Sequence, residues 1–356
     1  MVKPTIFREG NYSHTDLVAL NTNANCRIID IREKQLEELY KIQNPSTLLT
    51  PNFIPSLAKF LSQKLEGDRE LLGDWVFFPW SEVLLHTVSE SENYLLRTNR
   101  NRDIITQEEQ EKLYDFTISI AGLSVGGNIA TAIAYNGFSK NLKLADFDLL
   151  ETTNLNRIRG KLTDIGKPKL EVIGQQLYEL DPYINITSFS GGVNEGNLQD
   201  FLGGKYTTKL VFEIIDDLRT KILLRFEAKK LRIPLIMLTS IGDSVLIDVE
   251  RYDTDRSTTP FNGLVEEKEI EDILSGKATK SEENKYVIKI VGMENISKEV
   301  LDSVKEIGVS LVGRPQVMST ITVEAGIAVY LARMIALGQP IPSGRSRVKF
   351  EDFVKK

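Results

Sequence analysis

The chain has 356 residues, of which 41% are hydrophobic and 26% charged, and its net charge is -6 at neutral pH. This composition is typical of a folded globular protein, and the negative balance gives no electrostatic reason to expect a nucleic-acid partner. A single cysteine and only two histidines exclude an intrachain disulfide and a thiolate zinc cluster, so no zinc is expected. Carboxylates, lysines, arginines and backbone amides must carry any chemistry.

A signal peptide has an apolar run after its basic residues, and the N-terminal stretch of this chain has none. One long apolar stretch, near 321–337, contains Glu324 and Arg333, which favours a buried helix over a membrane span. We therefore expect a cytoplasmic protein without a membrane partner.

The first 110 residues differ in pattern from the rest. A strand-like run precedes an amphipathic helix pattern, a second helix pattern follows two prolines, and the aromatic run WVFFPW occupies residues 75–80. These features predict a small α+β module over residues 1–110. Its aromatic residues either pack a local core, which strand alternation favours, or form a surface for peptide recognition.

Strand and helix patterns alternate over residues 111–356. This alternation predicts an α/β domain built on a Rossmann-like, mostly parallel sheet with helices on both faces. Near 253–290, where charged residues, Thr, Ser and Gly are frequent, we expect a mobile crossover loop. The expected strands lie in 116–122, 142–148, 185–190, 209–216, 234–240 and 244–253, and helices in 128–135, 169–180 and 218–231.

A glycine turn, GLSVGG at residues 122–127, joins the first of these strands to a helix. Gly122 suits a tight bend, while Gly126 and Gly127 lack side chains where the helix N-terminus directs free N–H groups outward. The hydroxyl of Ser124 either bonds a phosphate or caps the turn. The turn is therefore a candidate phosphate site, with a purely structural bend as the alternative.

The second strand ends in ADFD, which places Asp146 where nucleotide-binding sheets carry a ribose-binding acid and adds Asp148 two residues on. The connection that follows supplies Asn154, Arg157 and Lys169. Cations and amide donors suit the oxygens of a triphosphate, whereas hydride transfer needs an apolar nicotinamide pocket. This stretch therefore favours ATP over NAD.

A later strand ends in Asp216 and Asp217, at the sheet edge where ligands of such folds bind. A carboxylate opposite a group of cations is typical of a magnesium ligand. Taken singly, each of these charges would more often be a solvated surface residue. Their occurrence in order, each at the end of a strand, indicates a site for ATP and Mg²⁺.

Together, the glycine turn, ADFD, NLNR, GKPK and IIDD resemble the ThiF/MoeB/HesA superfamily, bacterial relatives of ubiquitin-activating enzymes, over about residues 98–345. Such enzymes bind ATP and magnesium, attach AMP to a carboxylate and release pyrophosphate, usually as homodimers. The resemblance makes Asp146 the ribose ligand and Asn154 and Arg157 phosphate contacts. It makes Lys169 the principal lysine on the transferred phosphate and Asp216 the magnesium-binding acid.

Two further features of the resemblance concern an arginine before the first strand and the composition of the glycine loop. The run RTNRNRD resembles the opening motif of the family, so Arg102 matches its arginine finger, often supplied across the dimer, with Arg100 as second choice. The family's glycine loop reads G-x-G-G-x-G, and Ser124 and Val125 replace its inner glycines here. Because both residues carry a Cβ, we expect the loop either to avoid a left-handed conformation there or to lie slightly farther from the phosphates.

The chain lacks the cysteine pairs and reactive cysteine of many family members, which disfavours sulfur transfer and thioester formation. Its N-terminal module is similar to the front domain of enzymes that mature ribosomal peptide natural products of the microcin C or pantocin type. We therefore expect ATP-dependent adenylation of a carboxylate on a peptide or small protein in such a pathway. The alternatives are activation of the C-terminal glycine of a ubiquitin-like or sulfur-carrier protein, a nicotinamide-dependent oxidoreductase, and a non-catalytic nucleotide-binding scaffold.

Overall fold

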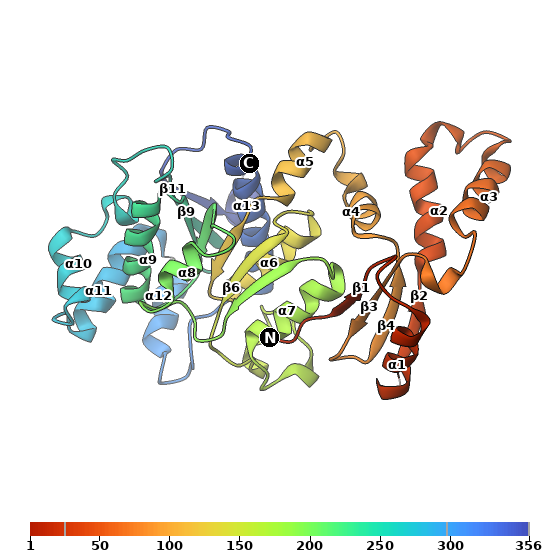
Figure 1. Ribbon diagram of the computed structural model, residues 1–356. Coiled ribbons are helices and arrows are strands. Elements are labelled where there is room, and N and C mark those ends of the chain that lie inside the picture. The colour runs from red at the N-terminus through yellow and green to blue at the C-terminus, as the bar shows by residue number, and fades with distance from the viewer. Residues whose placement is uncertain (25, 297, 355–356) are drawn as a thin grey trace. The chain divides into compact units, whose positions relative to one another are not determined.

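The structure, a computed structural model, describes residues 1–24, 26–296 and 298–354. The chain divides into two compact units (Figure 1). One unit comprises 1–111 together with two short later segments, 135–137 and 175–184, and the other comprises the rest of the chain. The module expected over 1–110 did not include these two segments, which are parts of helices and turns far along the sequence.

The N-terminal unit contains a four-stranded sheet in the order β1-β3-β4-β2. The pairs β1–β3 and β3–β4 are antiparallel, and β2–β4 is parallel. The aromatic run lies on β3, where Trp75 and Phe78 are buried and the Trp75 ring stacks on His86 at 4.2 Å between centroids. These rings therefore pack a local core, as strand alternation predicted. The elements are β1 (Thr5–Phe7), α1 (His14–Ala24), β2 (Arg27–Asp30), α2 (Arg32–Gln43), α3 (Phe53–Lys64), β3 (Asp74–Phe78), β4 (Val83–Thr87), α4 (Glu90–Thr98) and α5 (Gln107–Tyr114).

The segment 175–184 belongs to this unit because its polar side chains bond there. The Trp80 indole N–H donates to Glu179 Oε1 at 2.6 Å, and Arg97 pairs with Asp181. The Tyr183 hydroxyl donates to a carboxylate oxygen of Asp74 at 2.8 Å. Contacts between residues about 100 positions apart carry no local sequence signal, so the sequence did not indicate them.

The second unit contains a seven-stranded sheet within the described residues, in the order β11-β10-β9-β8-β5-β6-β7. Four neighbouring pairs are parallel, and β9–β10 and β10–β11 are antiparallel. All four residues of β5 are buried, as expected for a parallel strand covered on both faces. The Rossmann-like, mostly parallel sheet is thus confirmed. Its strands are β5 (Ile118–Ala121), β6 (Asn141–Ala145), β7 (Asn185–Phe189), β8 (Leu210–Glu213), β9 (Leu235–Ser240), β10 (Ser244–Glu250) and β11 (Gly344–Lys349).

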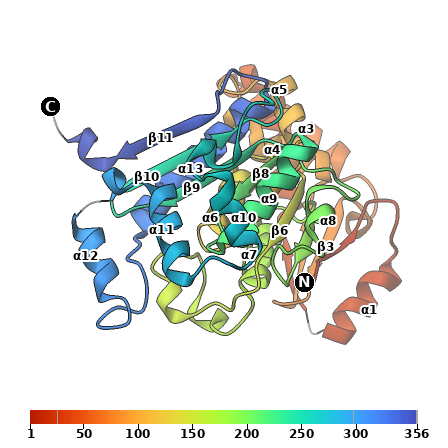
Figure 2. The same ribbon diagram turned by 90° about the vertical axis from the view of Figure 1, so that its left-hand side faces the viewer.

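Helices lie on both faces of this sheet (Figure 2). Helix α9 has the bounds 218–231 that the sequence pattern predicted, and α13 packs on β9 and β10. The helices wholly or partly in the unit are α6 (Val125–Tyr135), α7 (Lys169–Leu180), α8 (Leu198–Leu202), α9 (Leu218–Leu231), α10 (Glu267–Leu274), α11 (Lys280–Val291), α12 (Lys298–Glu306) and α13 (Met318–Ala336).

The segment near 253–290 differs from the expected mobile loop because most of it is helical. Helices α10 and α11 bury Ile270, Ile273 and Ile290 in a cluster that also contains Ile222 of α9 and Met237 of β9. Burying these apolar side chains stabilises the segment on the sheet. Its high charge reflects the exposed faces of the two helices rather than a lack of structure.

Strand order places a switch point between β5 and β8. From β5 the chain proceeds through β6 to β7 on one side, and then returns to β8 and β9 on the other. In open α/β sheets, ligands bind in the crevice outside the carboxyl ends of the strands at such a point. A ligand bound there would contact the residues that follow β5, β6 and β8.

Helix α13 is, among the described residues, the one helix long and apolar enough to cross a membrane by length and composition. It buries Thr320 and Glu324 against the protein, which suits a helix packed on a sheet. Both Glu324 carboxyl oxygens are buried without a hydrogen-bond partner among the described residues. Burial raises the pKa of Glu324 to about 8.

This raised pKa predicts a pH-dependent stability. Between the ordinary pKa of a glutamate and pH 8 the native state binds the proton more tightly than the unfolded state, so stability falls as pH rises through this window. We expect the loss to reach roughly 4 kcal/mol at pH 8.5. Glu324→Gln should flatten this dependence in urea unfolding between pH 5 and 8.5, whereas Glu267→Gln, at an exposed position of α10, should leave it unchanged. An unaltered slope in Glu324→Gln would contradict the assignment.

Candidate active site

The glycine turn begins at the end of β5, beside the end of β8. Gly122 has φ of +90°, and a Cβ there would lie 2.2 Å from the carbonyl oxygen of Ile214. A side chain at this position is excluded both by the conformation and by the neighbouring backbone. Gly122 therefore lets the two strand ends approach each other at the switch point.

The other two glycines of the turn serve packing. A Cβ on Gly126 would lie 2.7 Å from Ile120 Cγ2, and one on Gly127 would lie 2.9 Å from Ile173 Cδ1. The Gly127 N–H donates to the carbonyl oxygen of Leu123 at 3.2 Å, so it is occupied within the first turn of α6. Their role as direct phosphate contacts stays a prediction, and close packing of α6 on β5 and α7 is the role that the contacts support.

Ser124 and Val125 keep negative φ values, unlike Gly122. The loop thus avoids the left-handed conformation at both positions, as expected for residues with a Cβ. Ser124 is half-buried at the start of α6. A hydrogen bond from its hydroxyl to a phosphate stays a prediction.

Asp146, at the end of β6, holds the glycine turn. Its carboxylate accepts hydrogen bonds from Leu123 N–H at 2.6 Å and from Asp148 N–H at 2.8 Å. Burial raises the pKa of Asp146, while these two backbone donors and Lys169 act in the opposite direction. Each carboxylate oxygen has a second lone pair, so the same group has acceptor capacity left for a ribose hydroxyl.

Lys169 lies next to Asp148 because the intervening connection folds back. Its backbone N–H donates to the carbonyl oxygen of Asp148 at 2.9 Å, and its ammonium pairs with the Asp148 carboxylate at 2.8 Å. The Lys169 side chain is 9% exposed, whereas that of Asp148 is 52% exposed. The nearly buried Lys169 ammonium therefore lies close enough to act on Asp146, while its ion-pair partner Asp148 remains exposed to solvent.

Asn154 shapes the turn that presents Arg157. Its side-chain oxygen accepts from Glu151 N–H at 3.1 Å, and its carbonyl oxygen accepts from Arg157 N–H at 3.0 Å. The buried Asn154 is thus a turn-forming residue in this structure, and its predicted phosphate contact is untested.

Asn128, on the first turn of α6, connects that helix to Arg157. Its amide donates to the carbonyl oxygen of Arg157 at 2.8 Å. Asn128 Oδ1 and Arg157 Nε are both buried without a hydrogen-bond partner among the described residues. Buried polar atoms in native proteins are normally paired, so these two are candidates for contacts with a ligand or water. Sequence reasoning missed Asn128, whose only signal is its place directly after the paired glycines.

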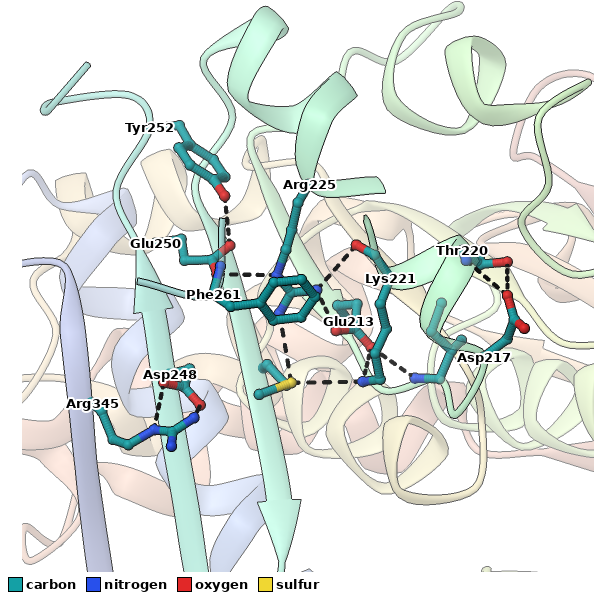
Figure 3. A network of polar contacts seen from close by, with 12 residues as sticks. Glu213, Asp217, Thr220, Lys221, Arg225, Asp248, Glu250, Tyr252, Phe261 and Arg345 are labelled. Atoms are coloured by element: carbon teal, nitrogen blue, oxygen red, sulfur yellow. Dashed lines mark hydrogen bonds and ion pairs between the residues drawn. The ribbon is translucent and has the colours of Figure 1, made fainter. Parts of the chain in front are cut away.

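The two aspartates after β8 have different roles. Asp217 caps α9, since its carboxylate accepts from Thr220 N–H at 2.7 Å (Figure 3). Asp216 has a side chain 94% exposed and pairs with Arg314 at 3.0 Å. Burial lowers the pKa of Arg157, and the charge of Asp216 acts against that shift. Asp216 is therefore the exposed carboxylate of the two, paired with Arg314 and close enough to Arg157 for its charge to act on that guanidinium.

Arg102 and Arg100 belong to the N-terminal unit, in and after the turn that follows α4, and both are exposed. The other predicted residues lie in the second unit. The role of Arg102 as an arginine finger, which the family resemblance implies, stays a prediction.

A buried ionic network joins α9 to β8 and β10 (Figure 3). Arg225 of α9 pairs with Glu213 of β8 at 2.7 Å and with Glu250 of β10 at 3.0 Å, and all three side chains are fully buried. Lys221 adds a second cation to Glu213 at 2.7 Å. Burial opposes the ionisation of Glu213, yet Lys221 and Arg225 together lower its pKa. The network fixes the strand from which Asp216 emerges.

The same network holds the start of the crossover segment. Glu250 accepts from the Tyr252 hydroxyl at 2.7 Å and from Phe261 N–H at 2.6 Å, and the Arg225 guanidinium lies 3.9 Å from the Phe261 ring centroid. Phe261 and Asn262 both have positive φ, a conformation that L-residues rarely adopt. The surrounding contacts stabilise this local strain.

A glycine turn at the switch point of a Rossmann-like sheet, followed by an acid on the next strand, is the arrangement found in nucleotide-binding α/β proteins. The model of the ThiF family matches residues 97–313. The chain therefore belongs to the ThiF family, which confirms the resemblance seen in the motifs.

Two curated relatives match over different lengths. The chain is similar to the uncharacterized protein MT1398 of Mycobacterium tuberculosis, with 33% identity over 308 residues, which make up 86% of this chain and 42% of that protein. It is also similar to the tRNA threonylcarbamoyladenosine dehydratase of Bacillus subtilis, with 29% identity over 156 residues, 43% of this chain and 59% of that protein. The chain thus spans less than two thirds of either relative.

Among solved structures, the chain is similar to E. coli MccB. The complex of MccB with ATP matches at a TM-score of 0.50 and 15% identity, covering 90% of this chain and 83% of that one. The complex with MccA-N7isoASN matches at a TM-score of 0.50 and 13% identity, covering 89% and 84%. At such low identity this likeness supports the fold, including both units of the chain.

Proposed function

We propose that this protein uses ATP to adenylate a carboxylate. The observation that carries the proposal is the connected group of residues at the switch point. Asp146 is bonded to the glycine turn, Lys169 stands beside it, and Asp216 follows the neighbouring strand. Membership of the ThiF family and the ATP complex of MccB support the same ligand.

The reaction needs charge neutralisation rather than a protein nucleophile. An oxygen of the substrate carboxylate attacks the α-phosphorus of ATP, the bond from that phosphorus to the bridging oxygen breaks, and pyrophosphate leaves with the electron pair. The product is an acyl adenylate, whose carbonyl is easily attacked. Lys169 and Arg157 would bind the phosphate oxygens and stabilise the negative charge that develops on them. Asp146 would orient the ribose.

Asp216 fits a magnesium ion. Mg²⁺ in nucleotide sites is commonly held by one or two carboxylates together with phosphates and water. The Asp216 carboxylate is exposed and already binds a cationic group, the Arg314 guanidinium, at 3.0 Å. No cluster of three or more metal-binding side chains occurs in the part of the chain that the structure describes. A bound Mg²⁺ would neutralise the departing pyrophosphate.

The substrate we propose is a peptide or small protein, as in ribosomal peptide maturation. The similarity to MccB extends over both units, and one MccB complex contains MccA-N7isoASN. The N-terminal unit would then recognise the peptide. Activation of a ubiquitin-like or sulfur-carrier protein is the alternative within the same chemistry, and the name of the Bacillus relative favours a modified tRNA as a third substrate.

A homodimer in the cytoplasm is the assembly we propose. Arg102 lies in the unit that does not carry the other predicted residues, so a finger supplied by a second copy is compatible with its place in the chain. Removing this cation should slow AMP formation without weakening the fold, because Arg102 is exposed.

The test offers ATP and MgCl₂ to the full chain with one of three substrate pools. These are synthetic peptides with free carboxylates, ubiquitin-like proteins that end in glycine, and bulk tRNA. We expect AMP and pyrophosphate to form with the peptide pool, and mass spectrometry to show an AMP adduct or loss of water on a peptide. Formation with another pool would move the substrate to that class. Binding of NADH without binding of ATP in calorimetry would overturn adenylation altogether.

A further inference from the structure

Asp216 and Arg314 form an ion pair across a long sequence separation at the rim of the candidate site. Arg314 Nη2 lies 3.0 Å from Asp216 Oδ1, and the two side chains are 48% and 94% exposed. Ion pairs this exposed contribute little to folding. Stability therefore does not explain why a cation stands on the carboxylate that the family motif assigns to magnesium.

Hydrogen bonds of Gln316, close to Arg314 in sequence, attach this part of the chain near the carboxyl ends of the strands. The Asn156 amide donates to the carbonyl oxygen of Gln316 at 2.7 Å, and the Gln316 amide donates to the Ser240 hydroxyl at 3.2 Å. Asn156 precedes Arg157, and Ser240 ends β9. These two bonds place Arg314 at the carboxyl edge of the sheet, where its long side chain reaches Asp216.

We propose that Arg314 is a positioning residue that occupies Asp216 until a divalent cation displaces it. This inference rests on the proposed function, since it concerns the metal of the same site. Arg314 occupies Oδ1 of Asp216, so a Mg²⁺ ion that takes this oxygen must first displace the guanidinium. The released guanidinium would be free to bind oxygens of the nucleotide.

Metal binding itself tests the competition. The full chain, saturated with a non-hydrolysable ATP analogue, is titrated with Mn²⁺ while electron paramagnetic resonance reports the free ion. Arg314→Gln should lower the half-saturating Mn²⁺ concentration about two- to fivefold, the factor that corresponds to losing one exposed ion pair. Arg314→Lys, which keeps the charge, should stay close to the unmodified protein. Adding Arg314→Gln to Asp216→Asn should change nothing further.

The matched control is Arg69→Gln, because Arg69 forms another exposed pair, with Glu33 at 3.6 Å, in the N-terminal unit. It should leave the Mn²⁺ titration unchanged. An unchanged or higher half-saturating concentration in Arg314→Gln would overturn the inference while leaving adenylation intact. Failure of the unmodified protein to bind the ATP analogue would instead overturn the proposed function, and the inference with it.

Discussion

Replacing Arg225 with methionine should lower the free energy of unfolding by about 3 to 5 kcal/mol, the range found when one partner of a buried ion pair is removed. Arg225 is fully buried between two carboxylates and contacts the ring of Phe261. Glu213 would keep Lys221, but Glu250 would be left with only neutral partners, the Tyr252 hydroxyl and a backbone N–H. Chemical denaturation at constant pH measures the loss.

The pH dependence of this stability loss shows whether it comes from an unpaired charge on Glu250 or from a packing defect. Burial already raises the pKa of Glu250, with Arg225 acting against this shift. Without Arg225 the pKa should rise further, so Glu250 would take up a proton more readily as pH falls and the loss of stability should be smaller at pH 5 than at pH 8. The double variant Arg225→Met/Glu250→Gln should recover part of the loss at pH 8.

The control for this prediction lies on the same helix. Lys230 forms an exposed pair with Glu227 at 3.1 Å, and Lys230→Met should change stability by no more than about 0.5 kcal/mol. A loss below about 1 kcal/mol in Arg225→Met, or one that does not depend on pH, would contradict the charge-based explanation.

The sequence predicted the class of the second unit because the signals involved are local. Strand and helix periodicities alternate from β5 onward, and each expected strand of the core sheet has a counterpart in the structure. Helix α9 begins at a residue preceded by the capping Asp217, and its apolar spacing continues to Leu231. Local patterns of this kind depend only on neighbouring residues, so they can be read without tertiary information.

The crossover segment shows where local signals fail. Its polar composition indicated a loop, but the two helices need only Ile270, Ile273 and Ile290 to attach them to the core. Phe261 and Asn262 adopt positive φ there, which no propensity would suggest. Tertiary contacts from Arg225 and Glu250 impose that geometry, and such contacts leave no trace in the adjacent sequence.

The candidate site could be predicted in part for the same reason. Gly122 and Asp146 directly follow a strand, Lys169 begins a helix, and Asp216 lies between β8 and α9, positions that a periodic pattern locates. Arg314 and Asn128 were missed because their partners are distant in sequence or because their unpaired atoms appear only in the folded chain. The function of Gly126 and Gly127 likewise depends on which isoleucines pack against them.

The buried network and the site are physically joined at β8. Glu213 Oε1 accepts from the N–H of Ile215, the residue just before Asp216, at 3.1 Å. The carboxylate that the two cations hold therefore also fixes the backbone leading to Asp216. Weakening the network should displace Asp216 more than Lys169, because the Lys169 ammonium pairs with Asp148, which lies outside the network.

Lys169→Ala should abolish the proposed reaction while sparing the fold. The ammonium is nearly buried beside the turn, where a charge-assisted bond to phosphate is worth about 1.5 to 3 kcal/mol, so ATP affinity should fall about 10- to 100-fold. Loss of charge stabilisation in the transition state should lower AMP formation by about 10³-fold. Stability should change little, because the partner Asp148 is 52% exposed and stays solvated.

The matched control for Lys169 stands two residues away on the same turn. Lys167 is 43% exposed and pairs with Asp164 at 2.9 Å, so Lys167→Ala removes one lysine from the GKPK motif without touching the buried ammonium. Calorimetric titration with ATP and MgCl₂ should separate the two variants, since only Lys169→Ala loses affinity. Equal affinities would remove Lys169 from the phosphate site. A loss in Lys167→Ala alone would move the phosphate contact outward to the exposed lysine, because a triphosphate needs one of the two ammonium groups at this helix N-terminus.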